Sequence, residues 1–297
     1  MLIDAANSPN QRLMLEFPNN ISVFIKREDL LHPQISGNKF RKLKYNLHAA
    51  RQMDYNTLLT FGGAYSNHIA AVAAAGDEFG FNTIGIIRGE ELVDKINDNP
   101  TLKLAQQQGM QLVFISRADY RSKSQADFIQ KLNNQFGEFY LIPEGGTNAL
   151  AVEGCREILT AQDKQQFDYV CCAVGTGGTI AGIIESSTDQ QTILGFPALK
   201  GDFLQAQIQQ WTNKTNWQLI PDYHGGGYAR TTPALLQFVQ DFKAQTGIEI
   251  EPIYTGKMLF GLFDLIHKHY FPANSQILVI HTGGLQGNLS SRFNSVI

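Results

Sequence analysis

The chain has 297 residues, of which 43% are hydrophobic and 17% are charged, and its formal net charge is −3. This length predicts two domains, or one large domain, with enough apolar material for a sizeable core. The charge balance gives no basic surface, so we expect no binding to nucleic acid or to an anionic membrane. No apolar run approaches the ~20 residues of a membrane span, so we expect no transmembrane helix. No secretory signal is evident, so we do not expect secretion.

Short β-rich runs alternate with helical patterns along almost the whole chain. Strands are predicted at residues 21–25, 57–61, 83–87, 111–115, 139–142, 169–174, 192–196, 217–220 and 276–280. Helices are predicted at 40–51, 68–79, 101–108, 123–135, 150–161, 180–185, 203–211, 233–246 and 258–269. The alternation predicts an α/β fold with mainly parallel sheet, and strands that are apolar on both faces suit sheets covered by helices on both sides.

The first helical pattern begins with Gly37-Asn38-Lys39, which follows the strand at 21–25 and a charged turn. Gly37 and Asn38 are turn formers that can cap a helix, so Lys39 is expected in the first helical turn. The positive end of the helix dipole disfavours a cation there, and a lysine with a lowered pKa is suited to attack a carbonyl. The alternative is an exposed lysine in a basic cluster.

Glycine-rich turns follow several of the strands. The turn at 61–68 ends in Ser66-Asn67-His68, where Ser66 or Asn67 would cap the next helix and free N–H groups could receive a carboxylate. The side chain of Asn67 can also donate to a phenolate oxygen. Capping alone is the alternative, and His68 by itself is more often a satisfied histidine than a base. The turns at 143–148 and 281–284 could each be structural.

The most informative turn lies between the strand at 169–174 and the next helix, and its residues are Gly175, Thr176, Gly177, Gly178 and Thr179. Successive backbone N–H groups and a helix N-terminus make an anion site, and the two threonines add hydroxyl donors. The turn lacks the lysine of a nucleoside-triphosphate loop and the full spacing of a dinucleotide site, so one small phosphate is the economical ligand. A tight turn that binds nothing is the alternative.

The three cysteines are Cys155, Cys171 and Cys172. Neighbours in one strand point to opposite faces, so Cys171 and Cys172 are not expected to pair. Their number and spacing argue against a disulfide framework and against zinc, and a reducing cytoplasm fits.

Tyr228 and Tyr254 each lie beside glycines; each is a candidate site residue or a packed aromatic.

Five motifs occur in an order that resembles a known family. They are Gly37-Asn38-Lys39-x-Arg41-Lys42-Leu43, Ser66-Asn67-His68, Gly175-Thr176-Gly177-Gly178-Thr179, Tyr254-x-Gly256-Lys257 and His281-x-Gly283-Gly284. Together they resemble the pyridoxal-phosphate enzymes of the 1-aminocyclopropane-1-carboxylate deaminase / D-cysteine desulfhydrase family, which have the tryptophan-synthase-β-like fold, type II. The resemblance spans about residues 20–290.

The resemblance implies two domains, each with a mainly parallel open sheet flanked by helices. Residues 1–47 and 161–297 would form a large cofactor-binding domain, and residues 48–160 a small inserted domain. Lys39 would form the Schiff base with pyridoxal 5′-phosphate. The implied cofactor-binding residues are Lys39, Lys42, Asn67, Gly175, Thr176, Gly177, Gly178, Thr179, Thr255 and Thr282. The implied substrate-binding residues are Ser66, Asn67, His68, Tyr228 and Tyr254, and the catalytic ones are Lys39, Ser66, Tyr228 and Tyr254.

Departures from the deaminase pattern bear on the reaction. The deaminases carry Glu and Leu where this chain has Thr255 and Thr282, as the desulfhydrases do. A neutral hydroxyl near the ring nitrogen strengthens the electron sink less than a carboxylate does. The resemblance therefore favours β-elimination from a small amino acid such as D-cysteine, to pyruvate, ammonia and sulfide. The alternatives are 1-aminocyclopropane-1-carboxylate deaminase and a non-catalytic phosphometabolite-binding protein.

Other departures concern the substrate pocket. Tyr65 stands where the family usually has Gln, and Ile69-Ala70 replaces residues that usually include Arg. These departures leave open a different substrate for this pocket. A homodimer is implied by the resemblance alone.

Overall fold

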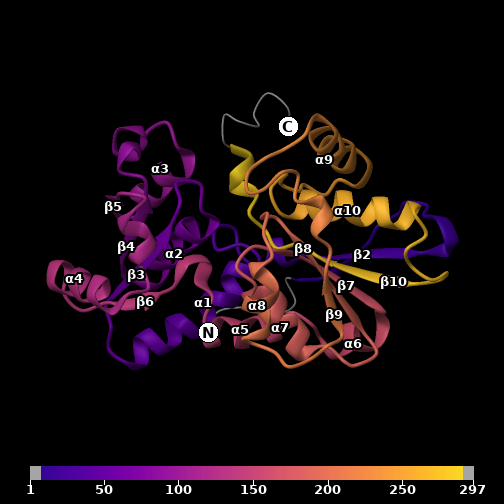
Figure 1. Ribbon diagram of the computed structural model, residues 1–297, viewed down its shortest axis with the longest axis horizontal. Coiled ribbons are helices and arrows are strands. Elements are labelled where there is room, and N and C mark those ends of the chain that lie inside the picture. The colour runs from indigo at the N-terminus through magenta and orange to yellow at the C-terminus, as the bar shows by residue number, and fades with distance from the viewer. Residues whose placement is uncertain (1–7, 290–297) are drawn as a thin grey trace.

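In the computed structural model, which describes residues 8–289, the chain folds around two separate β-sheets. The sheets lie side by side in Figure 1, the larger on the right and the smaller on the left. Both are built from parallel strands joined through helices, which confirms the predicted α/β class.

The larger sheet has six strands in the order β1-β2-β10-β7-β8-β9. Its strands are β1 (Asn10–Arg12), β2 (Ser22–Lys26), β7 (Tyr169–Val174), β8 (Thr192–Pro197), β9 (Trp217–Leu219) and β10 (Gln276–Ile280). All neighbours are parallel except β1, a short edge strand that pairs antiparallel with β2 and that the sequence pattern did not predict. Strand β10 inserts between β2 and β7, so both ends of the chain build this sheet.

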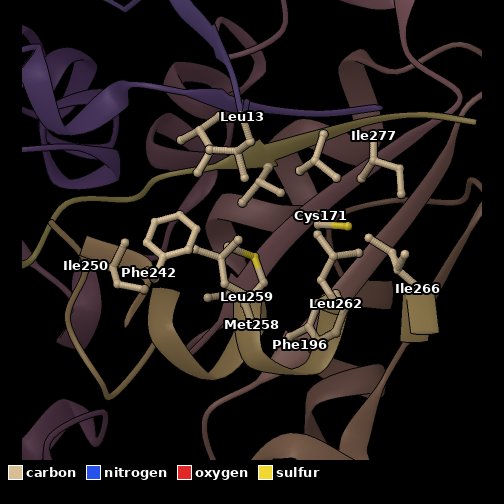
Figure 2. Packing of buried hydrophobic residues seen from close by; sticks show 14 of the residues in the cluster. Leu13, Cys171, Phe196, Phe242, Ile250, Met258, Leu259, Leu262, Ile266 and Ile277 are labelled. Carbon is tan, nitrogen blue, oxygen red and sulfur yellow. The ribbon is translucent and has the colours of Figure 1, made fainter. Parts of the chain in front are cut away.

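Two apolar cores cover the two faces of the larger sheet. On one face, α9 (Pro233–Thr246) and α10 (Thr255–His267) pack against the strands, as Figure 2 shows for Phe242, Leu259 and Leu262. On the other face lie α5 (Ala149–Arg156), α7 (Gly178–Ser186) and α8 (Phe203–Gln209). Cys171 belongs to the first core and Cys172 to the second, which confirms that these neighbours point to opposite faces.

The smaller sheet has four parallel strands in the order β5-β4-β3-β6. They are β3 (Thr57–Gly62), β4 (Asn82–Arg88), β5 (Gln111–Ile115) and β6 (Tyr140–Ile142). One face packs against α1 (Asn38–Gln52), α2 (Asn67–Phe79) and α3 (Pro100–Gln107), and the other against α4 (Ala126–Phe136).

One predicted helix is wrong in its extent. The pattern predicted a single helix over 150–161, but α5 ends at Arg156 and a separate helix, α6 (Ala161–Gln166), follows. Thr160 caps α6 together with Asp163, and Asp163 is held by Lys26 at 2.8 Å. The capping box of Thr160 and Asp163 is itself a local signal of a helix start, so the sequence pattern could have revealed the second helix.

The division into a domain of residues 1–47 plus 161–297 and a domain of residues 48–160 stays a prediction, which the composition of the two sheets supports. Within residues 8–289, no helix is both long and apolar enough to cross a bilayer. All three cysteines are buried free thiols.

Candidate active site

The carboxyl ends of strands from both sheets surround one cavity of about 380 Å³. Ligands of open α/β sheets bind beyond the carboxyl ends of the strands, and this volume lies in the usual range for small-molecule sites. Most of the predicted site residues line it: Lys39, Lys42, Ser66, Asn67, His68, Gly175, Thr176, Gly177, Thr179, Tyr228, Tyr254 and Thr282. Gly178 and Thr255 do not line it; Gly178 packs against Thr147, and Thr255 is fully buried behind Tyr254.

Lys39 is the second residue of α1, so it lies in the first helical turn, as the sequence predicted. The turn before it is tight, because a side chain at Gly37 would meet the Thr282 carbonyl oxygen at 2.0 Å, and Gly37 adopts a φ of 63°. The exposed part of Lys39 faces the cavity. Burial, and secondarily the charge of Lys42, lowers the pKa of Lys39 to about 7. The lowered pKa was expected, but burial rather than the helix dipole is its main cause.

Lys42 lies one turn further along α1 and is 2% exposed. Its Nζ donates to the Gly145 carbonyl at 2.9 Å, to Thr147 Oγ1 at 3.0 Å and to Thr176 Oγ1 at 3.4 Å. Burial lowers the pKa of Lys42, and no carboxylate of the described chain forms an ion pair with it. A buried ammonium without an anion is costly, so the surroundings of Lys42 call for an anionic ligand.

The glycine-rich turn lies beside Lys42 at the start of α7. Gly177 adopts a φ of 79° and precedes the first helical residue, so the backbone N–H groups of the turn meet the positive end of the helix. Thr179 Oγ1 accepts a hydrogen bond from Asn38 Nδ2 at 2.8 Å, which ties this turn to α1 beside Lys39. Thr176 Oγ1 lies 2.6 Å from Thr147 Oγ1. The turn and two lysines therefore form one cationic pole of the cavity.

The start of α2 forms another wall. Ser66 caps this helix, since its Oγ accepts from the N–H groups of His68 and Ile69. Asn67 Oδ1 accepts from Gln286 Nε2 at 2.9 Å, so Nδ2 is the atom of Asn67 that can donate to a ligand.

His68 is 1% exposed, and burial lowers its pKa well below the usual value. Thr60 donates its hydroxyl proton to Ile142, so His68 Nε2, 2.8 Å from Thr60 Oγ1, is the donor of that pair. His68 is therefore a neutral, packed histidine whose Nδ1 has no hydrogen-bond partner in the described chain, and its predicted role in substrate binding stays a prediction.

Tyr228 and Tyr254 form a further wall of the cavity. Their ring centroids lie 6.1 Å apart, and burial raises the pKa of both phenols, so both carry their proton at neutral pH. Glu251, 2% exposed, accepts from the N–H groups of Tyr254 and Thr255 at 2.7–3.1 Å and so fixes the start of α10. Lys257 donates to two carbonyls of the loop 224–227, which leads directly into Tyr228.

Several lining residues were not predicted as site residues, and three of them bear on the chemistry of the cavity. Asn38 was read only as a turn former, although it adjoins the key lysine. Arg88 and Glu144 are charged residues at the carboxyl ends of β4 and β6. Charged residues directly after buried parallel strands are a signal that could have identified both.

Comparison with known proteins agrees with this geometry. A family model described as pyridoxal-phosphate dependent enzyme matches residues 11–283. The chain is 32% identical to the mitochondrial bifunctional D-cysteine desulfhydrase/1-aminocyclopropane-1-carboxylate deaminase of Arabidopsis thaliana, over 91% of this chain and 74% of that protein. It is 30% identical to a putative 1-aminocyclopropane-1-carboxylate deaminase of Thermotoga maritima, over 90% and 89%.

A solved structure shows the same fold along nearly the whole chain. The crystal structure of a homologue of 1-aminocyclopropane-1-carboxylate deaminase superposes with a TM-score of 0.83 at 26% identity. The match covers 98% of this chain and 94% of that one.

Proposed function

Because the chain belongs to the pyridoxal-phosphate-dependent enzymes, we propose that it catalyses β-elimination from a small amino acid, D-cysteine or another β-substituted alanine. The products are pyruvate, ammonia and sulfide or another leaving group. The observation that carries this proposal is the pair of lysines at one pole of the cavity: an amine with a pKa of about 7 beside a buried ammonium that has no acidic partner in the described chain.

The residues of the cavity fit the cofactor. Lys42 and the turn 175–179 supply a cation, N–H groups and hydroxyls for the phosphate. With a pKa of about 7, Lys39 carries an unprotonated amine in a large share of molecules near neutral pH, so it can attack the aldehyde. Asn67 Nδ2 can donate to the phenolic oxygen, and Thr282 stands at the cavity wall with Thr255 behind. The buried Thr255 Oγ1 has no hydrogen-bond partner in the described chain, but Thr255 does not line the cavity, so Thr282 is the threonine of this pair that can meet the ring.

When bound, pyridoxal phosphate supplies an electron sink for the charge left on the substrate Cα. The residues of the chain supply position and proton transfer. The start of α2, at Ser66 and Asn67, receives the substrate carboxylate through its hydroxyl and N–H groups. Lys39 Nζ accepts the Cα proton, and the protonated phenols of Tyr228 and Tyr254 can donate to the leaving group.

A second candidate reaction is the deamination of 1-aminocyclopropane-1-carboxylate. The name of the Thermotoga relative favours it, whereas the name of the Arabidopsis relative contains both activities. Thr255 and Thr282 favour β-elimination, because the resemblance places Glu and Leu there in the deaminases. A non-catalytic role is favoured only if the cofactor binds and no amino acid changes its spectrum.

The test begins with the visible absorbance of the purified protein and its borohydride-reducible adduct. Lys39→Ala should remove both, whereas Lys44→Ala should keep them, because Lys44 lies on the same helix, pairs with Glu157 at 2.6 Å and does not line the cavity. An adduct that persisted in Lys39→Ala would refute the assignment of Lys39.

The substrate is identified by screening D- and L-cysteine, D- and L-serine, β-chloroalanine and 1-aminocyclopropane-1-carboxylate. Pyruvate release supports β-elimination. Release of 2-oxobutanoate from the cyclopropane acid alone would favour the deaminase instead.

We also propose a cytoplasmic enzyme, in keeping with its three free thiols, and a homodimer, on the resemblance alone. Light scattering at several protein concentrations tests the second statement.

A further inference from the structure

Arg88 is a cationic residue of the cavity that the roles above leave unused. It ends β4 and lines the cavity of about 380 Å³ as well as an adjoining one of about 430 Å³. Gly63, Asn67, Tyr228 and Tyr254 line both cavities too. Arg88 therefore stands where the two spaces join, beside the tyrosines and the start of α2.

Arg88 is an exposed residue whose guanidinium lies against the ring of Tyr120. Its Cζ lies 5.7 Å from the ring centroid of Tyr120, which is 3% exposed. Its Nη2 lies 3.6 Å from the position that a side-chain Cβ at Gly63 would occupy, so Gly63 leaves space beside it. Stacking on an aromatic face orients a guanidinium and leaves its N–H groups available.

Glu144, the acidic residue that lines the cavity of about 380 Å³ together with Arg88, is already engaged. Glu144 Oε1 accepts from the Tyr120 hydroxyl at 2.8 Å, and Oε2 lies 3.3 Å from Lys123 Nζ. Burial and Glu144 raise the pKa of Tyr120, which stays protonated as the donor. Among residues 8–289, Arg88 forms no ion pair and no side-chain hydrogen bond. A permanently charged fork of donors thus faces the cavity without an anion.

We propose that Arg88 binds a second anionic group, carried on the side chain of the amino-acid substrate. The inference rests on the proposed function, which assigns the substrate α-carboxylate to Ser66–Asn67 and the cofactor phosphate to Lys42 and the turn 175–179. Those two anions have their own donors, so Arg88 is left for a third. The adjoining cavity gives a longer or branched side chain room on the far side of Arg88. The substrate class is then an α-amino acid with a carboxylate, sulfonate or phosphate at or beyond Cβ.

For an anionic β-substituent, the reaction needs no reactant other than the amino acid and water. With O-phosphoserine, the Cα–H and Cβ–O bonds break, and the electron pair of the Cβ–O bond leaves with phosphate. The released 2-aminoacrylate tautomerises to an imine, and one water hydrolyses its C=N bond. One pyruvate, one ammonia and one phosphate form for each O-phosphoserine and water consumed.

The binding test titrates the visible spectrum of the holoenzyme with each enantiomer of aspartate and of asparagine, which is isosteric but neutral. We expect one enantiomer of aspartate to bind about tenfold more tightly than the matching asparagine, the effect of a charge-assisted contact at a partly exposed site. Arg88→Gln should abolish this preference while leaving the affinity for asparagine unchanged, and Arg88→Lys should keep part of it. Arg156→Gln is the matched control, since Arg156 pairs with Glu153 on the surface and lines neither cavity.

Each outcome discriminates. Equal affinities for aspartate and asparagine in the wild type, or no spectral change with either, would overturn the inference. A loss in Arg88→Gln that is equal for both amino acids would assign Arg88 to the α-carboxylate and would also overturn it. Absence of the cofactor spectrum in the wild type would overturn the proposed function itself.

A turnover measurement gives a second readout. Arg88→Gln should lower kcat/KM for O-phosphoserine about tenfold more than for β-chloroalanine, whose leaving group is uncharged before it departs. An equal loss for the two substrates contradicts the proposal.

Discussion

Replacing Lys39 by Met should change how the stability of the cofactor-free protein depends on pH. The pKa of Lys39 falls from 10.5 to about 7 in the folded chain, mainly through burial. Between these two values the unfolded chain holds a proton that the folded chain has released. The free energy of unfolding of the wild type therefore rises with pH through this interval.

The magnitude follows from the shift. For a folded pKa of about 7, the contribution of Lys39 grows by about 2 kcal/mol between about pH 7 and about pH 9. Lys39 keeps some surface that faces the open cavity, so solvent screening reduces this to about 1–2 kcal/mol. Lys39→Met lacks this contribution. The free energy of unfolding of the variant minus that of the wild type should therefore fall by that amount over the same range.

Urea unfolding at several pH values and constant ionic strength measures the difference. Taking the difference removes the contribution of Lys257, whose pKa burial lowers to about 8. Lys44→Met, on the same helix but outside the cavity, reports the effect of removing a charge elsewhere. A Lys39→Met difference that stayed constant with pH would show that the amine is not neutral near pH 8, and the reasoning about the nucleophile would fail.

Three further results are expected. Lys42→Met should leave the cofactor-free protein at least as stable as the wild type, because an unpaired buried charge is removed, yet weaken cofactor binding at least about tenfold in a spectral titration. Glu251→Ala should cost about 2–4 kcal/mol in urea unfolding, because the first N–H groups of α10 lose their acceptor in the interior. Lys257→Met should raise KM while the cofactor spectrum persists, because the loop 224–227, which leads directly into Tyr228, loses its tether; unchanged kinetics would show that this loop needs no anchor.

Local patterns were sufficient where local physics decides the outcome. The run 169–174 is apolar on both faces, and it forms a central strand between two apolar cores. The turn 175–179 was predicted from its glycines, and a cap at Ser66 or Asn67 was predicted because both residue types are preferred at helix N-caps; the structure has Ser66 as the cap. The break after Arg156 was missed because the helical pattern runs on past it, although the capping box of Thr160 and Asp163 is a local signal for the start of α6.

The sequence by itself determined the α/β class, the family, and the lysine and glycine-rich turn that stand at the centre of the site, because periodicity and turn chemistry act over a few residues. Only the tertiary structure decided which charges are neutralised. Glu144 is engaged by Tyr120 and Lys123, while Lys42 and Arg88 have no acidic partner in the described chain. The reason is that pKa values and charge pairing depend on burial and on neighbours brought from both sheets, and neither is encoded at any fixed spacing along the chain.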